Sequence, residues 1–351
     1  MKKSPGHESS SNKTDIIQIP YLWKNNKYLN FFQDNSQDLN FQYHKLSLFN
    51  RIFGIPKKIK MLHLNLCGTA YIDKFFVWRI SNYVKHGGRL FTTLHNRIKK
   101  NEFKNYDKLL KLSDKILIHC EDSYEELKKL KSYNLFKSRI VLIPHPNYCN
   151  YIKYTSKNHR SMFNFKEDDI VFMFHGLIEK RKRIENLIDI FKNINNNNIH
   201  LLIVGNVTFF KKAYAKKLAA LMKGIPNIHY RYGYIKDEEF NSWFNTSDIE
   251  IFTPNVNHQL NSASIMYSLS NKKTFISPDF GTVNSFKDKT FFFHFDSTSN
   301  NLHDSIIEIV NNIAKNYNRK KLLQMGEKAY EYVSKHNSIE LFISELKEFY
   351  K

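Results

Sequence analysis

A run of four cations stands where a strand-like segment gives way to a helix-like one. The segment Phe172–Leu187 reads FMFHGLIEKRKRIENL, and its strand is expected to end at His175-Gly176. Ligands of open α/β sheets bind beyond the carboxyl ends of the strands, where cations can neutralise a diphosphate as it binds and as it leaves. The alternative is a solvated charge cluster. The cations are Lys180, Arg181, Lys182 and Arg183.

Three polar residues crowd the expected start of a helix in the segment Asn257–Ser285, which reads NHQLNSASIMYSLSNKKTFISPDFGTVNS. Asn261, Ser262 and Ser264 can simply cap the free amides of the helix. Alternatively, the same amides and hydroxyls can hold a phosphate, because a helix N-terminus attracts anions. Capping explains one such residue better than three. We therefore expect this helix start and the four cations to converge on one pyrophosphate.

Candidate acid-base residues follow two strands of the first half of the chain. His95 and Asn96 end one expected strand and face the cleft expected between the halves, with Glu102 a short loop away. An imidazole or carboxylate here can take the proton of an attacking hydroxyl, so His95 or Glu102 is a candidate general base. The alternative for His95 is a hydrogen bond to a loop. His145 ends the last strand of this half, where it can line the cleft or pack against Tyr148.

Apolar runs alternate with helix-like stretches, which is typical of α/β architecture with parallel sheets. The strands expected in the first half are Ile16–Pro20, Lys60–Leu66, Arg89–Leu94, Lys115–His119 and Arg139–Ile143. Those in the second half are Ile170–Phe174, Ile199–Val204, Asn227–Arg231, Asp248–Phe252, Lys273–Ser277 and Thr290–His294. Between them, helices are expected at Tyr71–His86, Tyr106–Leu112, Ser123–Leu130, Ile184–Asn193, Lys211–Met222, Glu238–Asn245 and Ser262–Ser270. Each half therefore predicts one doubly wound, Rossmann-like unit.

The chain is expected to form two domains, residues 1–150 and 151–351, because its length exceeds what one core usually organises. The polar stretch Asn150–Asp168 is the candidate linker. Leu302–Lys351 is expected to form two helices, and the last can return to the first domain. Residues 1–15 are expected to be a disordered tail and not a signal peptide, because no apolar stretch follows the two lysines at their start.

The composition is that of a folded and strongly basic chain. Hydrophobic residues make up 42%, but the apolar runs fall far short of the roughly 20 residues that cross a bilayer. The net charge of +21 suits nucleic acid, anionic lipid or phosphorylated substrates as partners, or simply a solvated surface. Cys67, Cys120 and Cys149 lack zinc-ligand spacing, so no metal is expected, and free thiols fit a reducing cytosol.

Two stretches mix aromatic and basic side chains in a way that suits a membrane surface. They are Lys74–Lys85 (KFFVWRISNYVK) and Thr208–Lys217 (TFFKKAYAKK). For the first stretch, helix periodicity favours core packing of Phe76, Ile80 and Tyr83 instead.

No GxGxxG or GxxxxGKS/T motif follows any expected strand, which disfavours dinucleotide oxidoreductases and P-loop NTPases. The chain instead resembles glycosyltransferases of the GT-B fold from roughly Lys60 to Gly281, and among them bacterial transferases that build capsular and other exported polysaccharides. Those enzymes share an ordered series of features in the second half of the chain. It consists of a strand, a Gly, a basic residue near the position of Lys182, a helix start with small residues, and a Pro-x-x-Gly turn. Their LxSGS-like element reads Leu260-Asn261-Ser262-Ala263-Ser264 here. The matching elements of the first half are His63-Leu64-Asn65, Thr93-Leu94-His95-Asn96, Leu117-Ile118-His119-Cys120-Glu121 and Ile143-Pro144-His145-Pro146-Asn147-Tyr148.

The resemblance implies two Rossmann-like domains that face each other across a cleft, with a nucleoside-diphosphate sugar as donor and no metal or other cofactor. His95 and Glu102 remain the catalytic candidates, and Asn96 and His145 are expected as cleft or acceptor residues. The donor-binding residues expected from the residues and the resemblance together are Gly176, Lys180, Arg181, Lys182, Asn261, Ser262, Ser264 and Ser285.

Two positions and one missing pattern depart from what these transferases commonly show. In related transferases an acidic residue after the Pro-x-x-Gly turn commonly binds the donor ribose, and this chain has Ser285 near that position. Glu179 stands at a position where those enzymes often have Arg. The Glu-(seven residues)-Glu pattern of many retaining members is absent from Asn257–Ser285. This absence favours inversion at the anomeric carbon.

The expected activity is transfer of a sugar from a nucleoside-diphosphate sugar to a hydroxyl of a lipid-linked oligosaccharide in surface polysaccharide synthesis. The enzyme would be cytoplasmic and held by its charge, as a peripheral protein, at the inner face of the cell membrane. One alternative is a sugar-nucleotide epimerase of the same fold. The other is a basic nucleic-acid-binding protein, which is disfavoured because the cations are dispersed and no RNP, zinc-finger or helix-turn-helix signature occurs.

Overall fold

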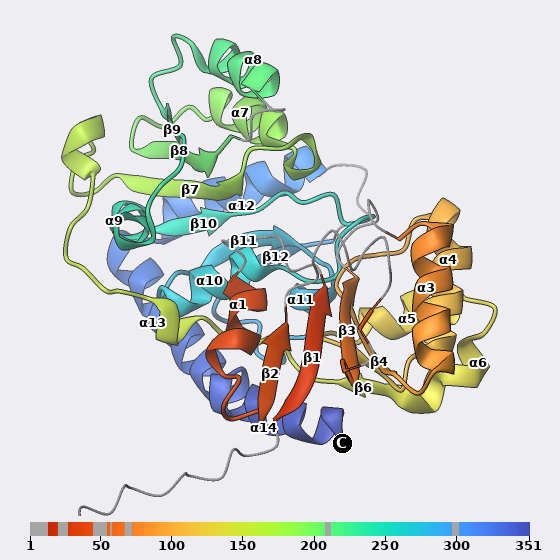
Figure 1. Cartoon of the computed structure of the whole chain (residues 1–351). Helices are drawn as coiled ribbons and strands as arrows, with labels where there is room; N and C mark the ends of the chain where they lie inside the picture. Colours follow the sequence, from red (N-terminus) through yellow and green to blue (C-terminus); the bar gives the residue numbers. More distant parts are fainter. Residues whose placement is uncertain are drawn as a thin grey trace, which may run out of the picture. The chain divides into compact units, whose positions relative to one another are not determined.

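The computed structural model describes residues 13–19, 27–44, 55–56, 58–66, 72–207, 212–296 and 302–351. Most of the expected N-terminal tail, Cys67 and the first residues of the stretch Thr208–Lys217 lie outside these described residues. The chain divides into two compact units, whose elements are labelled in Figure 1. Unit 1 comprises Met1–His119, Ser123–Ile143 and Ile343–Lys351, and unit 2 comprises Cys120–Asp122 and Pro144–Phe342.

Unit 1 is built on a parallel sheet with the strand order β2-β1-β3-β4-β5-β6. The strands are β1 (Thr14–Ile19), β2 (Phe41–His44), β3 (Met61–Leu66), β4 (Arg89–Leu94), β5 (Lys115–Ile118) and β6 (Ile140–Leu142). The helices are α1 (Lys27–Asp34), α3 (Lys74–Lys85), η1 (Lys100–Glu102), α4 (Phe103–Leu112), α5 (Asp122–Lys128), α6 (Tyr133–Phe136) and η2 (Lys137–Arg139). The last helix of the chain, α14 (Ile339–Tyr350), enters unit 1 at Ile343.

Unit 2 is built on a second parallel sheet with the order β12-β11-β10-β7-β8-β9. The strands are β7 (Ile170–Leu177), β8 (Ile199–Asn206), β9 (Ile228–Tyr232), β10 (Ile249–Ile251), β11 (Phe275–Pro278) and β12 (Phe293–Phe295). The helices are η3 (Cys149–Tyr151), η4 (Arg160–Phe163), η5 (Lys180–Lys182), α7 (Ile184–Lys192), α8 (Lys212–Met222), α9 (Asp237–Thr246), α10 (Ala263–Ser270), α11 (Gly281–Asn284), α12 (Leu302–Asn316) and α13 (Arg319–His336).

Alternate residues of β7 enter two separate cores. Phe172 and Phe174 pack with α7, α8 and α12, whereas Val171 and Met173 pack with α9, α10 and α13. A parallel strand covered on both faces must be apolar at every position, because successive side chains point to opposite faces. This is why the segment from Ile170 to Phe174 is an unbroken apolar run.

The expected α/β architecture with two doubly wound sheets is confirmed. Every strand expected from the sequence is present, Arg89–Leu94 with the expected bounds and the others with shifted bounds, and Gly87, just after α3, has a φ of +87°. β2 was not expected. The expectation of two helices in Leu302–Lys351 is wrong, because α12, α13 and α14 are separate. Asn318 starts a new helix there, since its side chain accepts a hydrogen bond from the Lys321 amide at 2.9 Å.

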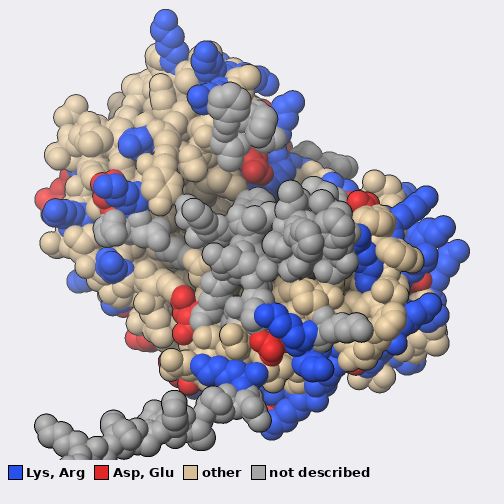
Figure 2. Space-filling view, viewed as in Figure 1, with Lys and Arg blue, Asp and Glu red and all other residues tan. Residues whose placement is uncertain are grey.

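Lys and Arg side chains are spread over the described surface on the face shown in Figure 2, in line with the net charge of +21.

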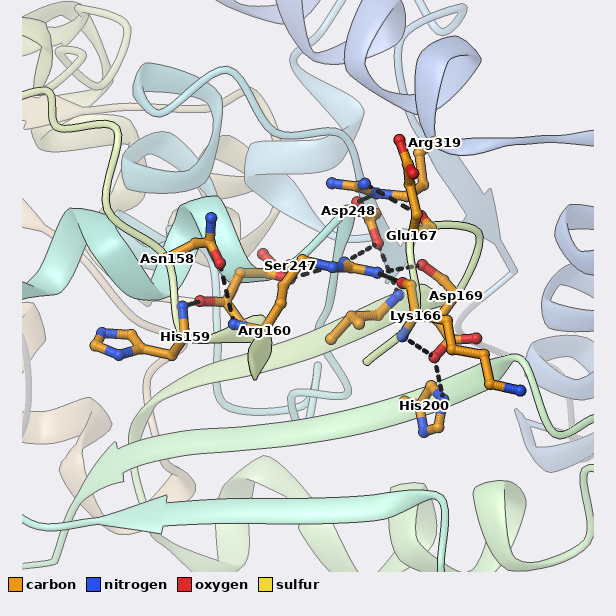
Figure 3. A network of polar contacts seen from close by, with 12 residues as sticks. Asn158, His159, Arg160, Lys166, Glu167, Asp169, His200, Ser247, Asp248 and Arg319 are labelled. Carbon is orange, nitrogen blue, oxygen red and sulfur yellow. Dashed lines mark hydrogen bonds and ion pairs between the residues drawn. The ribbon is translucent and has the colours of Figure 1, made fainter. Parts of the chain in front are cut away.

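A buried ionic network ties the amino ends of the unit 2 strands together (Figure 3). Asp248, just before β10, lies 3.1 Å from Arg160 and 2.7 Å from Arg319. Asp169, just before β7, pairs with His200 on β8 at 3.2 Å. Charges at this edge of the sheet are therefore matched within the protein.

The C-terminal end of the chain is anchored in the core of unit 1. His63, on β3, lies 2.5 Å from the Tyr350 hydroxyl through Nδ1 and 2.7 Å from the Thr93 hydroxyl through Nε2. Complete burial lowers the pKa of His63 to about 3, so the ring is neutral.

Candidate functional site

The carboxyl end of β7 approaches the start of α10. Gly176 has a φ of +131°, and a Cβ added there would lie 3.8 Å from the Ser264 hydroxyl. Only glycine adopts this backbone region readily. Its neighbour on β8, Gly205, is equally constrained, because a Cβ there would lie 2.1 Å from the Gly176 carbonyl oxygen. The two glycines let the strand ends and the helix start come together.

The cationic turn η5 is held against the segment that leads into α10. The Thr253 hydroxyl donates to the Lys182 carbonyl at 2.8 Å. The Asn255 amide donates to the Arg181 carbonyl at 2.9 Å. The structure thus brings the two segments singled out in the sequence to the same edge of the sheet.

The cations of this turn have different surroundings. Lys182 is only 9% exposed, whereas Lys180 and Arg181 are exposed. Arg181 pairs with Glu179 at 2.5 Å. The Lys182 ammonium has no hydrogen bond or ion pair within the described residues. Burial, together with the charge of Arg181, lowers the pKa of Lys182 to about 8, while Glu179 acts in the opposite direction.

The polar residues at the start of α10 divide between capping and exposure to the turn. Ser262 is the N-cap, and its hydroxyl accepts from the Ile265 amide at 3.3 Å. Its own amide donates to the Thr282 hydroxyl at 2.9 Å. The Asn261 carbonyl accepts from the Gln259 side chain at 3.0 Å. Ser264 is the residue that faces Gly176. The amides of the first helical turn have no carbonyl acceptor within the helix, because the first intrahelical hydrogen bond is donated by the Met266 amide.

Ser285 lies beyond α11. Its side chain is exposed and donates to the Thr282 carbonyl within its own turn at 2.7 Å. No hydrogen bond of the described residues links Ser285 to η5 or to the start of α10.

A buried pair beside Gly176 was not found by sequence reasoning. His175 Nδ1 lies 2.8 Å from Glu250 Oε2, and the other oxygen of Glu250 accepts from the Ser247 hydroxyl at 2.8 Å. His175 is 3% exposed and Glu250 is fully buried. The only signal in the sequence is that each interrupts an apolar strand. The pair links β7 to β10 just before the Gly176 bend.

His95 of unit 1 lies at the carboxyl edge of its sheet, half-buried among polar and aromatic groups. Its Nε2 lies 3.1 Å from the Asn65 side-chain oxygen, and its ring meets that of Tyr28 edge-on at 4.8 Å. Asn96 follows it and is half-buried. The loop after them is fixed by Glu126, a buried carboxylate that accepts from the Ile98 amide at 2.8 Å.

Glu102 and His145 have local partners. The Glu102 carboxylate is 8% exposed, accepts from the Lys99 amide at 3.3 Å and lies 4.0 Å from the Lys99 ammonium. His145 is buried in unit 2, with its ring 5.9 Å from that of Tyr148, as in the packing alternative. Burial lowers the pKa of His145 to about 4. No hydrogen bond or ion pair of the described residues joins His95 to Glu102.

The described residues hold no cluster of three or more His, Cys, Asp or Glu side chains arranged for a metal ion. Within the same residues, none of the helices combines the length and the apolar character that crossing a bilayer requires.

Comparison with known proteins gives one family and a set of similar folds. Residues 155–265, which include β7, η5 and the start of α10, match the family model described as glycosyl transferases group 1. No curated protein sequence matches this chain.

The chain is similar along nearly its whole length to solved structures. HepE (Alr3699) of Anabaena, solved in complex with UDP, is 11% identical, with a TM-score of 0.71 over 96% of this chain and 98% of that one. A glycosyltransferase of Rickettsia africae is 14% identical, with a TM-score of 0.71 over 97% and 98%. A sucrose-phosphate synthase of Thermosynechococcus elongatus is 12% identical, with a TM-score of 0.67 over 83% and 73%.

Proposed function

We propose that this chain, which is a glycosyltransferase of the GT-B fold, takes its sugar from a uridine-diphosphate sugar bound in unit 2 and passes it to a hydroxyl of an acceptor bound by unit 1. The observation that carries the proposal is the Lys182 ammonium, which is buried in the turn that follows the Gly176 strand end and has no ion pair within the described residues. An unpaired buried charge is costly to the folded protein. A bound diphosphate would supply the missing counter-charge.

Three further features support the donor site. The free amides and the dipole of α10 favour a phosphate near Ser264. Gly176 leaves room for it, because a side chain there would point toward Ser264. The uridine nucleotide is suggested by HepE, which has been solved with UDP and with UDP-glucose.

We propose His95 as the general base that removes the proton of the acceptor hydroxyl, with Glu102 as the other candidate. His95 is favoured because it lies at a strand end beside the Asn65 side chain, whereas Glu102 is engaged by Lys99. We further propose inversion, because Asn257–Ser285 lacks the paired glutamates of many retaining members. The anomeric coupling constant of the product measures the stereochemistry, and a retained configuration would remove the need for this base.

We propose a lipid-linked oligosaccharide of surface polysaccharide synthesis as the acceptor and a peripheral position at the inner face of the membrane. The net charge of +21 supports this, because it attracts both an anionic bilayer and a diphosphate-lipid. The test is turnover of a UDP-sugar with lipid-linked and with water-soluble acceptors. An acceptor-free reaction serves as the control, because an epimerase would need no acceptor.

Titration with UDP tests the donor site. Lys182→Met keeps the length and burial of the side chain but removes its charge, and it should weaken UDP binding about tenfold or more, since charge-assisted contacts are the strong ones. Lys192→Met, at the exposed end of α7, is the matched control. Unchanged affinity of Lys182→Met in a folded protein would place the diphosphate elsewhere.

A further inference from the structure

Helix α3 presents two large aromatic side chains to solvent. Phe75 is 55% exposed and Trp78 is 60% exposed. Their rings are stacked, with centroids 5.9 Å apart and planes at 18°. The opposite side of the helix carries the buried residues Val77 and Ile80. Core packing therefore accounts for one side of this helix and leaves the aromatic side unexplained.

The aromatic pair is accompanied by a cation that has no ion pair among the residues that the structure describes. The Arg79 guanidinium lies 4.3 Å from the centre of the Phe75 ring. Its Nε and Nη1 atoms are covered by protein and have no hydrogen-bond acceptor among the described residues. Lys74 precedes the pair and is exposed.

The neighbouring helix α4 adds a row of lysines. α4 packs on α3, and the Asn105 side chain donates to the Ile72 carbonyl just before α3 at 2.8 Å. Lys104, Lys108 and Lys111 follow at helical spacing and are all exposed. Figure 2 shows Lys and Arg gathered on the side of the molecule where Figure 1 places α3 and α4.

The positive charge of this row is not offset locally. None of the three lysines has an ion pair within the described residues, whereas Lys128, the last residue of α5, and Lys129, just after it, pair with Glu125 and Glu126. The one acidic residue of α4, Asp107, is engaged elsewhere, because it accepts from the Ser132 amide at 2.8 Å and from its hydroxyl at 2.9 Å.

We infer that this surface, consisting of Lys74, Phe75, Trp78, Arg79, Lys104, Lys108 and Lys111, docks the protein on an anionic phospholipid bilayer. Phe75 and Trp78 would lie at the headgroup level and the cations at the phosphates. The inference rests on the proposed membrane position of the enzyme and names the surface responsible. We favour a lipid interface over single-stranded nucleic acid because the Arg79 guanidinium lies over the Phe75 ring, on a face where a base would otherwise stack.

The experiment measures binding of the full chain to vesicles of phosphatidylglycerol and phosphatidylcholine, and to vesicles of phosphatidylcholine alone. Binding should require phosphatidylglycerol and weaken with salt. The triple change Lys104→Gln, Lys108→Gln and Lys111→Gln should weaken it about a hundredfold at low salt, given the attraction of each cation near an anionic surface. The double change Phe75→Ser and Trp78→Ser should weaken it about tenfold.

Controls on unit 2 change exposed lysines and exposed apolar side chains outside the two membrane-like stretches. The lysine control changes Lys223, Lys315 and Lys335 to Gln, all exposed in the structure. The apolar control changes Met162 and Leu323, 63% and 45% exposed, to Ser. Both controls should bind vesicles like the unchanged chain. The fluorescence of Trp78 should shift to the blue on vesicle binding, and this shift should be absent from Trp78→Ala.

UDP binding separates this inference from the proposed function. The aromatic variant should bind UDP normally, which also shows that it is folded. Full vesicle binding by both surface variants would overturn the docking surface and leave the donor site intact. Loss of UDP binding in Lys182→Met with vesicle binding preserved supports both proposals. Binding of single-stranded RNA that is tighter than vesicle binding and lost in the aromatic variant would overturn the inference in favour of a nucleic-acid surface.

Discussion

The Asn255 amide donates to the Arg181 carbonyl at 2.9 Å, and this contact fixes the cationic turn after β7 against the segment that enters α10. Two residues earlier in the same segment, the Thr253 hydroxyl donates to the Lys182 carbonyl. The charge of the turn is thereby positioned through its backbone, and these two contacts leave the Lys182 side chain available to a ligand.

Thr253→Val should disturb both stability and donor binding. Thr253 is 1% exposed, and valine keeps its shape but leaves the Lys182 carbonyl without its donor. We expect a loss of about 1–3 kcal/mol in the free energy of unfolding and weaker UDP binding, because a buried acceptor is left unsatisfied. Thr274→Val is the control, since the Thr274 hydroxyl donates to the Phe291 carbonyl at 2.8 Å. It should destabilise similarly in urea unfolding without changing UDP affinity, and equal effects on affinity would contradict the role of Thr253.

Two glycine substitutions should separate a loss of stability caused by overpacking from a loss of UDP affinity. An alanine Cβ at Gly205 would lie 2.1 Å from the Gly176 carbonyl, and one at Gly326 would lie 1.9 Å from the Lys272 carbonyl. Each should cost about 1–3 kcal/mol of stability through overpacking. Only Gly205→Ala should also weaken UDP binding, since it displaces Gly176. Calorimetry of the two variants, followed by UDP titration, checks this, and equal affinities would show that the Gly176 bend is not part of the donor site.

Donor binding should depend on pH through Lys182. Its pKa in the free protein is about 8, so the ammonium is fully charged only below that pH. A bound diphosphate raises this pKa, and affinity should therefore be constant below about pH 8 and fall at most about tenfold per pH unit above it. The measurement is the Kd of the UDP-sugar across this range. Lys182→Met should bind weakly and lack this dependence. The ionisation of the ligand is common to both proteins and cancels in the comparison.

His95→Ala and Glu102→Gln should identify the base. If His95 takes the proton, its removal should lower kcat about 10²- to 10⁴-fold, as expected for general base catalysis, with little change in UDP affinity. Glu102→Gln should then affect thermal stability more than kcat, because the carboxylate holds the Lys99 turn. Steady-state kinetics with a saturating acceptor tests this, and the reverse ranking of the two variants would assign the role to Glu102.

Acid should destabilise the protein through two buried histidines. Burial lowers the pKa of His63 to about 3 and that of His145 to about 4, from 6.5 in the unfolded chain. The unfolded chain therefore binds more protons below pH 6.5. The stability present above that pH should be lost by up to about 1.4 kcal/mol per pH unit for each histidine as the pH falls toward the folded values. Urea unfolding of His63→Gln should show a shallower slope, and His86→Gln, at the exposed end of α3, should leave it unchanged.

The fold was predictable where local pattern and tertiary structure agree. The apolar runs of β7 and β8 predict buried parallel strands, and the structure confirms them. β2, with only Phe41–His44, is too short to give such a pattern. The number of helices in Leu302–Lys351 was wrong because the sequence around both Asn318 and Asn337, the two ends of α13, contains neither Gly nor Pro.

The candidate site was predictable in its location and not in its details. The carboxyl ends of parallel strands share an edge, so β7 and the strand before α10 had to bring their loops together. The sequence gives four adjacent cations equal weight, whereas burial distinguishes Lys182 in the folded protein. The His175–Glu250 pair depends on strand order, which no local pattern reveals.

The contact between His63 and Tyr350 has a consequence for biosynthesis. Residues 343–351 belong to unit 1, yet the ribosome adds them after every residue of unit 2. The surface of the unit 1 sheet around His63 and Phe91 therefore stays uncovered until α14 has left the ribosome. A nascent chain stalled before Ile343 would expose this apolar surface to chaperones, although all the strands of both sheets had already been translated.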